Sequence, residues 1–563
     1  MQRHALASAL LLALALSACG TVGTDTKADA AADTTPAAAM PQASLVEAAA
    51  PASLDRVRTT GARRVPAMEA YAMAPPPAPP APAMQAANTE RYAAHDDNPV
   101  HRTSEQPVST FSIDVDTGSY ANVRRMLHDG VRPPADAVRA EEMINYFRYG
   151  HPAPDSRDVP FRVSTELAPA PWNGKRQLLM IGIKGYDVPA ATLPPANLVL
   201  LLDTSGSMYS PDKLPLLKQS MKQLVNQLRA QDRVSIVVYA GSAGLVLPPT
   251  PGDRKGDILS ALERLQAGGS TNGGDGIRLA YAMAKQGYVE GGVNRVILAT
   301  DGDFNVGTVD QGALETLVAD QRKAGIALTT LGFGTGNYND ALAEQLADIG
   351  DGNHAYIDSL SEARKVLVRE MGSTLLTIAR DVKIQVEFNP AVVSEYRLVG
   401  YENRVLRNED FANDKVDAGD IGAGHEVTAL YEITPAGSGA EQLPVLRYGS
   451  SHPAPAAGTG EVAHLRLRYK RPGEDESRLI TTPIATSSLR ATPSDTLRFA
   501  ATVAAYADAL RGGSRIGEWG WDDILRSAKQ VQGGDSQRTE FTGLVETARA
   551  LVEGQPEVAS VVD

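Results

Sequence analysis

The sequence predicts an α/β protein, with a doubly wound, Rossmann-like parallel sheet flanked by a β-sandwich-like domain and by N-terminal and C-terminal helical segments. Between residues 191 and 378, apolar strand-like runs alternate with helical patterns, which is typical of βαβ units around a parallel sheet. After residue 381, short alternating strands are separated by Gly-, Asp- and Pro-rich turns, as in an antiparallel sandwich.

The length and composition of the chain exclude several classes of protein. A chain of 563 residues is too long for one compact domain. With 54 Lys and Arg against 67 Asp and Glu, the net charge of −13 argues against nucleic-acid binding. Cys19 is the only cysteine, so the chain has no internal disulfide framework, Cys-rich zinc site or CxxC redox pair.

Residues 1–18 predict a secretory signal peptide with a basic start and a short uncharged apolar run. The run is too short for a membrane-spanning helix, which needs about 20 apolar residues. It ends in Leu16-Ser17-Ala18-Cys19-Gly20, which resembles the lipobox of bacterial lipoproteins. The resemblance implies acylation of Cys19 and a membrane anchor in the cell envelope, and a residue other than Asp after the cysteine favours the outer membrane. The alternative is an ordinary secretory signal with an incidental cysteine.

Residues 19–107 are predicted to be a disordered tether rich in Ala and Pro. Residues 31–90 contain 20 Ala and 10 Pro and a single aromatic residue, Tyr71. Such a composition buries too little apolar surface to offset the entropy of ordering the chain, and its proline run favours extended polyproline II segments. The tether would let a folded body stand off from a membrane.

Residues 108–190 form an N-terminal segment of mixed pattern. Its expected elements are a short strand near Phe111, helices from Ser119 and at 137–147, and strands at 161–167 and 177–184. Two such short strands are too few for a stable sheet. We therefore expect them to pair with strands after residue 381, so that the α/β domain is inserted into the sandwich.

The α/β domain is predicted to span residues 191–378. Its expected strands are 197–202, 233–239, 295–299, 326–333 and 354–357, and its expected helices are 213–228, 257–265, 276–285, 311–323, 340–349 and 361–376. The 197–202 run is apolar throughout, which suits a strand buried on both faces. Ligands of such sheets bind beyond the carboxyl ends of the strands.

Residues 379–563 are predicted to form a β-rich and then helical C-terminal domain. Its expected strands are 382–388, 395–401, 427–433 and 462–469, and its expected helices run from the Ser494-Asp495 cap to about residue 511, near 521–530 and near 539–551.

Polar residues follow three strands or loops at the ligand-binding edge of the predicted parallel sheet. Asp203, Ser205 and Ser207 follow the first strand, Thr271 lies in a Gly269-Ser270-Thr271 loop, and Asp301 follows a later strand. This set resembles the metal-ion-dependent adhesion site (MIDAS) of von Willebrand factor type A (VWA) domains. The resemblance implies that the three hydroxyls bind the ion and that the two carboxylates act mainly through water.

The residue types at this edge fit a hard divalent cation such as Mg²⁺, or Mn²⁺ or Ca²⁺, since these ions take oxygen ligands. If neutral hydroxyls bind directly, the ion keeps enough charge to attract an Asp or Glu of a protein partner. We therefore predict that the chain is a binding protein and not an enzyme. A metal site that catalyses hydrolysis needs a base beside an activated water, and these three loops contain no histidine to act as one. The alternatives are a metal-stabilised structural scaffold of the envelope, a metal-dependent hydrolase, or loops whose Ser and Asp only cap helices and turns.

Other motifs are interpreted as structural. Asp116-Thr117-Gly118-Ser119 spells the DTGS of aspartic proteases, but a second such loop is missing and a helical pattern follows at once. Asp114, Thr117 and Ser119 are therefore interpreted as turn and cap residues. Ser210 and Lys213 match S-x-x-K without a KTG partner, which favours a helix start. His354 is isolated in sequence from other histidines and is expected on the surface or in a strand.

The flanking sequences sharpen the resemblance. The stretches FSIDVDTGSYANVRRMLHDG before the α/β domain and ATDGDFNVG at Asp301 are similar to those of the bacterial YfbK-type VWA lipoproteins. This family implies no ligand. VWA domains that switch conformation shift their last helix, here 361–376, whereas in a rigid VWA domain that helix only packs on the sheet. The sequence leaves these two alternatives, the ligand and the oligomeric state open.

Overall fold

The computed structural model describes residues 89–270, 272–302, 311–444, 460–513, 515–517 and 519–554. The signal peptide, Cys19, residues 19–88 of the predicted tether and Thr271 lie outside these ranges. The prediction that the tether extends to residue 107 is wrong, because residues 89–107 pack on the folded body. The Thr89 and Arg91 N–H groups donate to the Gly336 and Tyr338 carbonyls at 2.8 and 2.9 Å, and His101–Arg102 forms strand β1. The described residues belong to one compact unit, Ala83–Asp563. Within them, every helix is too short or too polar to cross a membrane.

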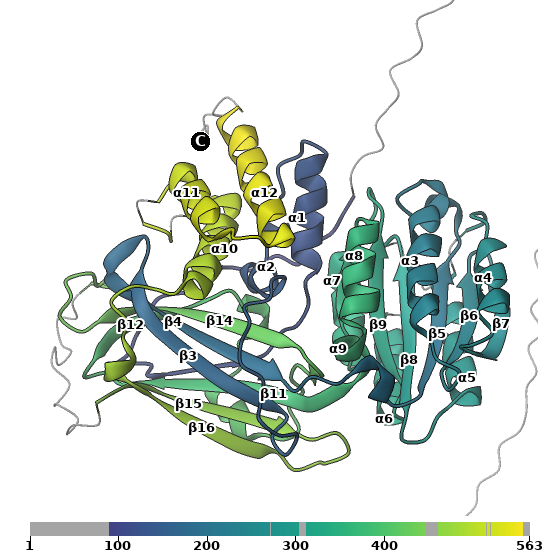
Figure 1. Ribbon diagram of the computed structural model, residues 1–563, viewed down its shortest axis with the longest axis horizontal. Coiled ribbons are helices and arrows are strands. Elements are labelled where there is room, and N and C mark those ends of the chain that lie inside the picture. Colours follow the sequence, from purple (N-terminus) through teal and green to yellow (C-terminus); the bar gives the residue numbers. More distant parts are fainter. Residues whose placement is uncertain are drawn as a thin grey trace, which may run out of the picture. The chain divides into compact units, whose positions relative to one another are not determined.

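The α/β domain contains a six-stranded sheet in the order β10-β9-β8-β5-β6-β7 (Figure 1). Five strands are parallel, as predicted: β5 (Ala196–Asp203), β6 (Arg233–Tyr239), β8 (Val293–Thr300), β9 (Ala327–Phe333) and β10 (His354–Ile357). The sixth, β7 (Ala243–Pro251), is antiparallel to β6 and was not predicted. Its prolines obscured the strand pattern, and they are tolerated because β7 lies at the edge of the sheet.

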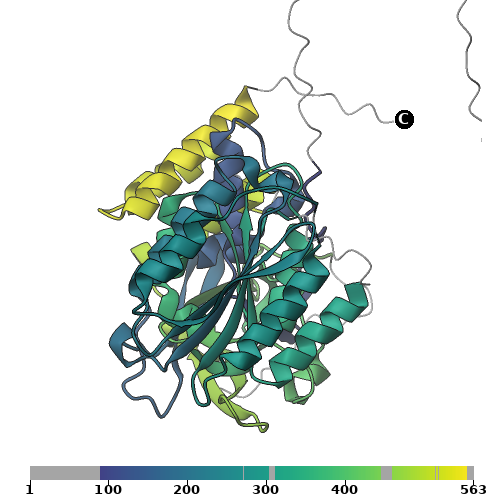
Figure 2. The same cartoon turned by 90° about the vertical axis from the view of Figure 1, so that its right-hand side faces the viewer.

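Helices cover both faces of this sheet (Figure 2). On one face lie α3 (Leu214–Gln227), α4 (Lys255–Glu263) and α8 (Leu360–Arg364); on the other lie α5 (Gly273–Gln286), α6 (Gln311–Lys323) and α7 (Asp340–Ile349). All eight residues of β5 are buried. The doubly wound architecture predicted from the sequence is therefore confirmed.

The last helix of the α/β domain differs from the single helix predicted at 361–376. It consists of α8, a π-helical turn at Lys365–Arg369 and α9 (Met371–Leu375). The wide turn is closed by the Glu370 N–H, which donates to the Lys365 carbonyl at 2.9 Å. Three consecutive residues in this turn, Lys365, Val366 and Leu367, are buried, and a regular helix would spread them over more than half of its circumference.

Two sheets form the sandwich. One has the order β1 (His101–Arg102), β12 (Val393–Val399), β14 (Glu426–Pro435), β4 (Asn173–Gly185), β3 (Phe161–Ala170). The other has the order β13 (Ile421–Gly422), β11 (Thr377–Phe388), β15 (Glu461–Lys470), β16 (Arg478–Ala485), and β2 (Val108–Ser112) also pairs with β11. Since β4 pairs with β14 and β2 with β11, the α/β domain is inserted between strands of one sandwich, as predicted.

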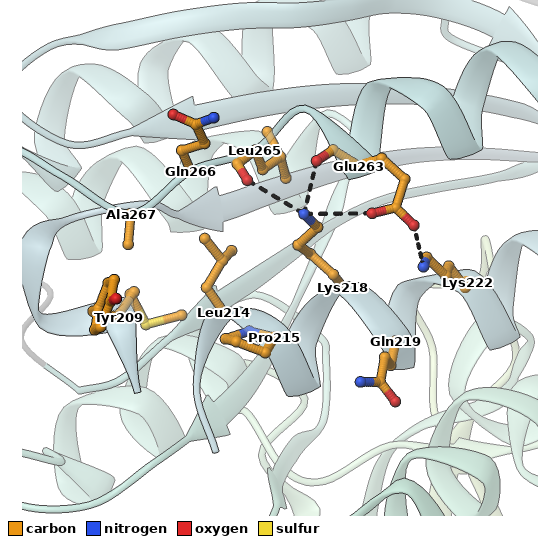
Figure 3. Close-up of a pocket in the computed structure, with 11 residues that line it drawn as sticks. Tyr209, Leu214, Pro215, Lys218, Gln219, Lys222, Glu263, Leu265, Gln266 and Ala267 are labelled. Atoms are coloured by element: carbon orange, nitrogen blue, oxygen red, sulfur yellow. Dashed lines mark hydrogen bonds and ion pairs between the residues drawn. The ribbon is translucent and has the colours of Figure 1, made fainter. Parts of the chain in front are cut away.

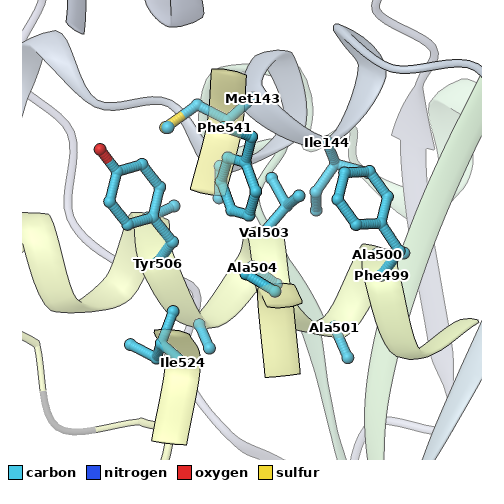
Figure 4. Close-up of a cluster of buried hydrophobic side chains, with 14 of the residues drawn as sticks. Met143, Ile144, Phe499, Ala500, Ala501, Val503, Ala504, Tyr506, Ile524 and Phe541 are labelled. Atoms are coloured by element: carbon cyan, nitrogen blue, oxygen red, sulfur yellow. The ribbon is translucent and has the colours of Figure 1, made fainter. Parts of the chain in front are cut away.

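The helices at the two ends of the chain form one layer on the β4–β14 sheet. This layer contains α1 (Gly118–His128), α2 (Ala140–Asn145), α10 (Asp495–Arg511), α11 (Trp521–Val531) and α12 (Ser536–Glu553). Figure 4 shows Met143 and Ile144 of α2 against Phe499 and Phe541. Alternation along β4 serves both cores, because Leu178 faces the helices and Leu179 faces the sandwich interior.

Candidate metal site of the α/β domain

The first loop of the predicted site is held by its own hydrogen bonds. Asp203 ends β5, and its Oδ1 accepts the Ser205 N–H at 2.8 Å. Ser205 precedes a short 3-10 turn, Gly206–Tyr209, and its Oγ lies 2.9 Å from the Oγ of Ser207. This turn therefore places two neutral hydroxyls side by side, directly after a buried carboxylate.

The other two loops converge on the first one. The Gly206 N–H donates to the Gly269 carbonyl at 3.0 Å, which ties the first loop to the loop that leads to Thr271. Asp301 follows β8, the neighbour of β5, and Thr300 Oγ1 donates to Asp203 Oδ2 at 3.5 Å. Four of the five predicted metal residues thus lie on loops that contact one another, whereas Thr271 is outside the described residues.

The electrostatics of this edge favour a cation. Asp203 and Asp301 are fully buried. Burial raises the pKa of Asp203 to about 6, against the hydrogen bonds from Ser205, and the Asp301 charge adds to the rise. Asp301 Oδ1 is buried and has no hydrogen-bond partner among the described residues. An unpaired buried carboxylate oxygen is costly, so this donor set of hydroxyl and carboxylate oxygens fits a hard divalent ion.

Lys213, whose S-x-x-K pattern favours a helix start, also lies at this site. Lys213 Nζ donates to Asp301 Oδ2 at 2.9 Å, and only 7% of Lys213 is exposed. The two residues are 88 positions apart, so no local pattern marks the contact. Only the tertiary structure, which places the start of α3 beside the loop after β8, brings them together.

A groove lies beside the first loop (Figure 3). Its volume is about 500 Å³, and Met208 and Tyr209, which directly follow Ser207, form part of its lining. Tyr209 is 84% exposed, which is unusual for a large aromatic residue. Lys218 donates to the carbonyls of Glu263 and Leu265 at 2.8 and 3.3 Å on the opposite side of the groove.

The DTGS motif lies elsewhere, at a buried charged junction. Asp114 Oδ1 accepts the Asp116 N–H at 3.1 Å, as expected for a turn, whereas Thr117 precedes α1 without a side-chain cap bond. Ser119 is not a cap either, because its Oγ donates to the Ala137 carbonyl at 2.7 Å.

Three buried carboxylates at this junction could geometrically hold a metal: Asp114, Glu142 and Glu344 have oxygens within 4.8 Å of one another. However, Arg139 pairs with Glu142 and Glu344, and Arg404 pairs with Asp114 and Glu344. The cluster is therefore an ion-pair network between domains.

His354 also belongs to this junction. The prediction left a surface position and a strand position open. His354 lies in strand β10 and is buried, so the strand position is the one observed. Its ring nitrogens lie 2.9 Å from Thr330 Oγ1 and 2.8 Å from Tyr338 Oη. A histidine with both nitrogens engaged inside the fold has a structural role here.

Comparison with known proteins identifies the family. Models of the von Willebrand factor type A domain and of the C-terminal part of uncharacterized protein YfbK match residues 197–370 and 373–551, and a von Willebrand factor model matches residues 86–180. The uncharacterized protein YfbK of Escherichia coli is 48% identical over 474 residues, which cover 83% of this chain and 82% of that protein. The chain belongs to the YfbK family. Its α/β domain is a VWA domain.

Other relatives of this YfbK-family chain match less of it. The uncharacterized protein sll0103 of Synechocystis is 27% identical over 52% of this chain and 65% of its own length. A solved von Willebrand factor type A structure from Catenulispora acidiphila is 16% identical, covers 74% of this chain and 93% of its own, and has a TM-score of 0.39. Both YfbK and sll0103 carry the description "uncharacterized", so neither supplies a partner or an activity.

Proposed function

We propose that this YfbK-family chain is a lipid-anchored binding protein of the cell envelope and not an enzyme. In this proposal its VWA domain holds a divalent cation, Mg²⁺ or else Mn²⁺ or Ca²⁺, and recognises an acidic group on a protein partner. VWA domains commonly bind metal ions and proteins, and the chain shares that fold. The observation that carries the proposal is the buried Asp301 Oδ1, which has no hydrogen-bond partner among the described residues and lies near Asp203 and its Ser205–Ser207 turn.

The proposed ligands are Ser205, Ser207 and Thr271, with Asp203 and Asp301 supporting them through water. When bound, the ion would offer an open coordination position, where its positive charge would attract an external carboxylate. Asp203 orients the turn by accepting the Ser205 N–H, so the hydroxyl pair is held in place before any ligand arrives. This arrangement supports recognition, because a preformed site loses little conformational entropy on binding.

The groove beside the site supports a protein partner over a free small anion. Tyr209 offers an exposed aromatic ring two residues after Ser207, and Lys222 adds a positive charge paired with Glu263. A peptide with an Asp or Glu followed by an apolar side chain would engage the ion and this surface together. Aromatic residues of this kind often dominate the energetics of protein interfaces.

Two alternatives lead to different outcomes in the same experiments. In a metal-stabilised scaffold, removal of the metal would lower stability without changing any partner. In a metal-dependent hydrolase, a turnover screen with and without Mg²⁺ would detect product formation. We favour recognition because the described parts of the three loops contain no histidine and the adjoining groove carries the exposed aromatic ring of Tyr209.

The metal site is tested by titrating the full-length chain with Mg²⁺ in a calorimeter. We expect Asp203→Ala to weaken Mg²⁺ binding by at least about tenfold, since it removes a buried carboxylate that orients the hydroxyls. Asp275→Ala is the matched control, because Asp275 is an exposed carboxylate of the neighbouring helix α5. Equal affinity in the Asp203 variant would mean that these loops are only capped turns.

The partner is tested by pull-down from an envelope extract with Mg²⁺ or with a chelator. Proteins captured by the parent chain should be lost with the chelator and with Asp203→Ala. Capture that is unchanged under both conditions would contradict recognition through the metal.

The anchor is tested by metabolic labelling with a fatty-acid analogue. We expect the parent chain to carry the label and to fractionate with the outer membrane, because the residues before Cys19 resemble a lipobox and several acyl chains anchor a protein stably. Cys19→Ser should lose the label and the membrane association. Equal labelling of both chains would show that Cys19 is incidental.

A further inference from the structure

Lys213 places a positive charge inside the proposed metal site. Its Nζ lies 2.9 Å from Asp301 Oδ2, and the side chains of Lys213 and Asp301 are 9% and 0% exposed. The remaining Asp301 oxygen has no hydrogen-bond partner among the residues that the structure describes. The Asp301 carboxylate thus pairs with Lys213 through one oxygen, and its other oxygen can bind a second cation.

The path of the lysine is built into the fold. Lys213 precedes α3, and its backbone N–H donates to the Ser210 carbonyl at 3.0 Å. Its stem passes over Gly334, just after β9, where an added Cβ would lie only 2.3 Å from Lys213 Cγ. Gly334 also has φ of +71°, a conformation that favours glycine. Three elements therefore cooperate to deliver this ammonium group to Asp301.

The charges explain what the lysine does. Asp203 and Asp301 are both buried, and two adjacent buried carboxylates repel each other. The ammonium group compensates one of them. A divalent ion bound at Ser205 and Ser207 would then meet a like charge across Asp301, which opposes its binding.

We infer that Lys213 is a tethered cation that competes with the divalent ion for Asp301 and so sets the metal affinity of the site. Without metal it keeps the Asp203 and Asp301 loops assembled. When a divalent ion binds, Lys213 either contacts Asp301 together with the ion or moves away from Asp301. The inference rests on the proposed metal site but not on the identity of any partner.

The experiment compares Mg²⁺ binding by the full-length parent chain, Lys213→Met and Lys213→Arg, using Mg²⁺ alone as the probe in calorimetry. We expect Lys213→Met, which keeps most of the stem and removes the charge, to bind Mg²⁺ about tenfold more tightly. Lys213→Arg keeps the charge and should stay within about threefold of the parent. Lys323→Met is the matched control, because Lys323 is a 70% exposed lysine of α6 that pairs with Asp320 instead of Asp301.

Thermal unfolding of the same chains gives a second readout. Without metal, Lys213→Met should melt at a lower temperature than the parent, and Mg²⁺ should raise its melting temperature more than that of the parent. If Lys213→Met does not fold, Lys213→Gln takes its place. Equal or weaker Mg²⁺ binding by the uncharged variant, or no binding by either chain, would overturn the inference and leave Lys213 as a structural ion pair. Tighter Mg²⁺ binding without a captured partner would sustain it while contradicting the proposed recognition function.

Discussion

Buried charged residues are concentrated where the VWA domain meets the sandwich and the helical layer. Arg124 of α1 pairs with Asp358 and Glu362 of the VWA domain at 2.6 and 2.8 Å and with Glu540 of α12 at 2.9 Å. One guanidinium group therefore connects three parts of the chain. Removing one partner of such a network leaves an uncompensated buried charge, which costs more than a surface ion pair contributes.

Glu344 of α7 makes the junction sensitive to pH. Burial raises its pKa to about 8 from an ordinary value of 4.5, although Arg139 and Arg404 act in the opposite direction. Glu142 and Asp340 raise it further. Because the folded-state pKa is the higher one, the folded chain holds a proton that the unfolded chain has lost between pH 4.5 and 8. This contribution to stability is present below pH 4.5 and is lost as the pH rises toward 8.

We therefore expect the free energy of unfolding to fall between pH 5 and 8 by on the order of a few kcal/mol. Glu344→Gln removes the titrating group, so its stability curve should be flatter over this range. Urea unfolding at a series of pH values measures both curves. Glu409→Gln, at a side chain that is 70% exposed, is the control and should follow the parent. Parallel curves for Glu344→Gln and the parent would contradict the assignment.

The element that links the VWA domain to the sandwich is its interrupted last helix. The α8 part is tied to the N-terminal segment through Glu362, which accepts hydrogen bonds from Arg124 and Tyr146 Oη. Beyond the π-helical turn at Lys365–Arg369, α9 ends at Leu375 and β11 begins at Thr377. Movement of the whole helix is thus opposed by α1, and the π-helical turn is the place where the two halves can shift independently.

We predict that ligand binding changes the exposure of the second half of this helix. Hydrogen exchange of the full-length chain, with and without Mg²⁺ and a carboxylate-bearing peptide, should differ in residues 365–380 and change less in residues 360–364. A π-helical turn is a less stable arrangement than a regular helix, so a small bias at the loops of the proposed metal site can alter its opening. Changes confined to the loops at Asp203 and Asp301 would show that the site binds without signalling.

At the scale of the whole molecule, the two ends of the chain complete each other. Strands β3 and β4 come before the VWA domain and extend a sheet whose other strands include β12 and β14, which follow it. Phe541 of α12 contacts Phe147, Phe499 and Tyr506, with ring centroids 5.2 to 5.6 Å apart. Both the sandwich and the helical layer therefore need residues from each side of the insertion.

We expect residues 379–563 alone to remain unfolded, because β11 and β14 would lose β2 and β4 as partners and the helical core would lose α1 and α2. Residues 89–190 supplied as a separate polypeptide should restore a cooperative unfolding transition. Circular dichroism during thermal unfolding measures this transition. Cooperative unfolding of residues 379–563 alone would contradict the insertion.

In the intact chain, Phe541→Ala should lower the free energy of unfolding by about 3–5 kcal/mol, since it empties a fully buried site.

The sequence by itself determined most of the elements and placed Asp203, Ser205, Ser207 and Asp301 on loops at one edge of the sheet. Periodicity identified all five parallel strands, because strands buried on both faces are continuously apolar, and the order of loops at one sheet edge predicted where Asp203, Ser205 and Asp301 would meet. It did not predict β7 or the π-helical turn, where prolines and three consecutive buried residues depart from the regular patterns.

Only the tertiary structure decided which distant residues share a site. Lys213 meets Asp301, β4 pairs with β14, and Arg124 reaches Glu540 across 416 positions. Local patterns reflect the backbone geometry of a few neighbouring residues, so they determine whether a segment forms a helix or a strand. Contacts between distant segments depend on how whole faces pack, and in this chain that packing brings the lysine to the proposed metal site and the arginine to the junction.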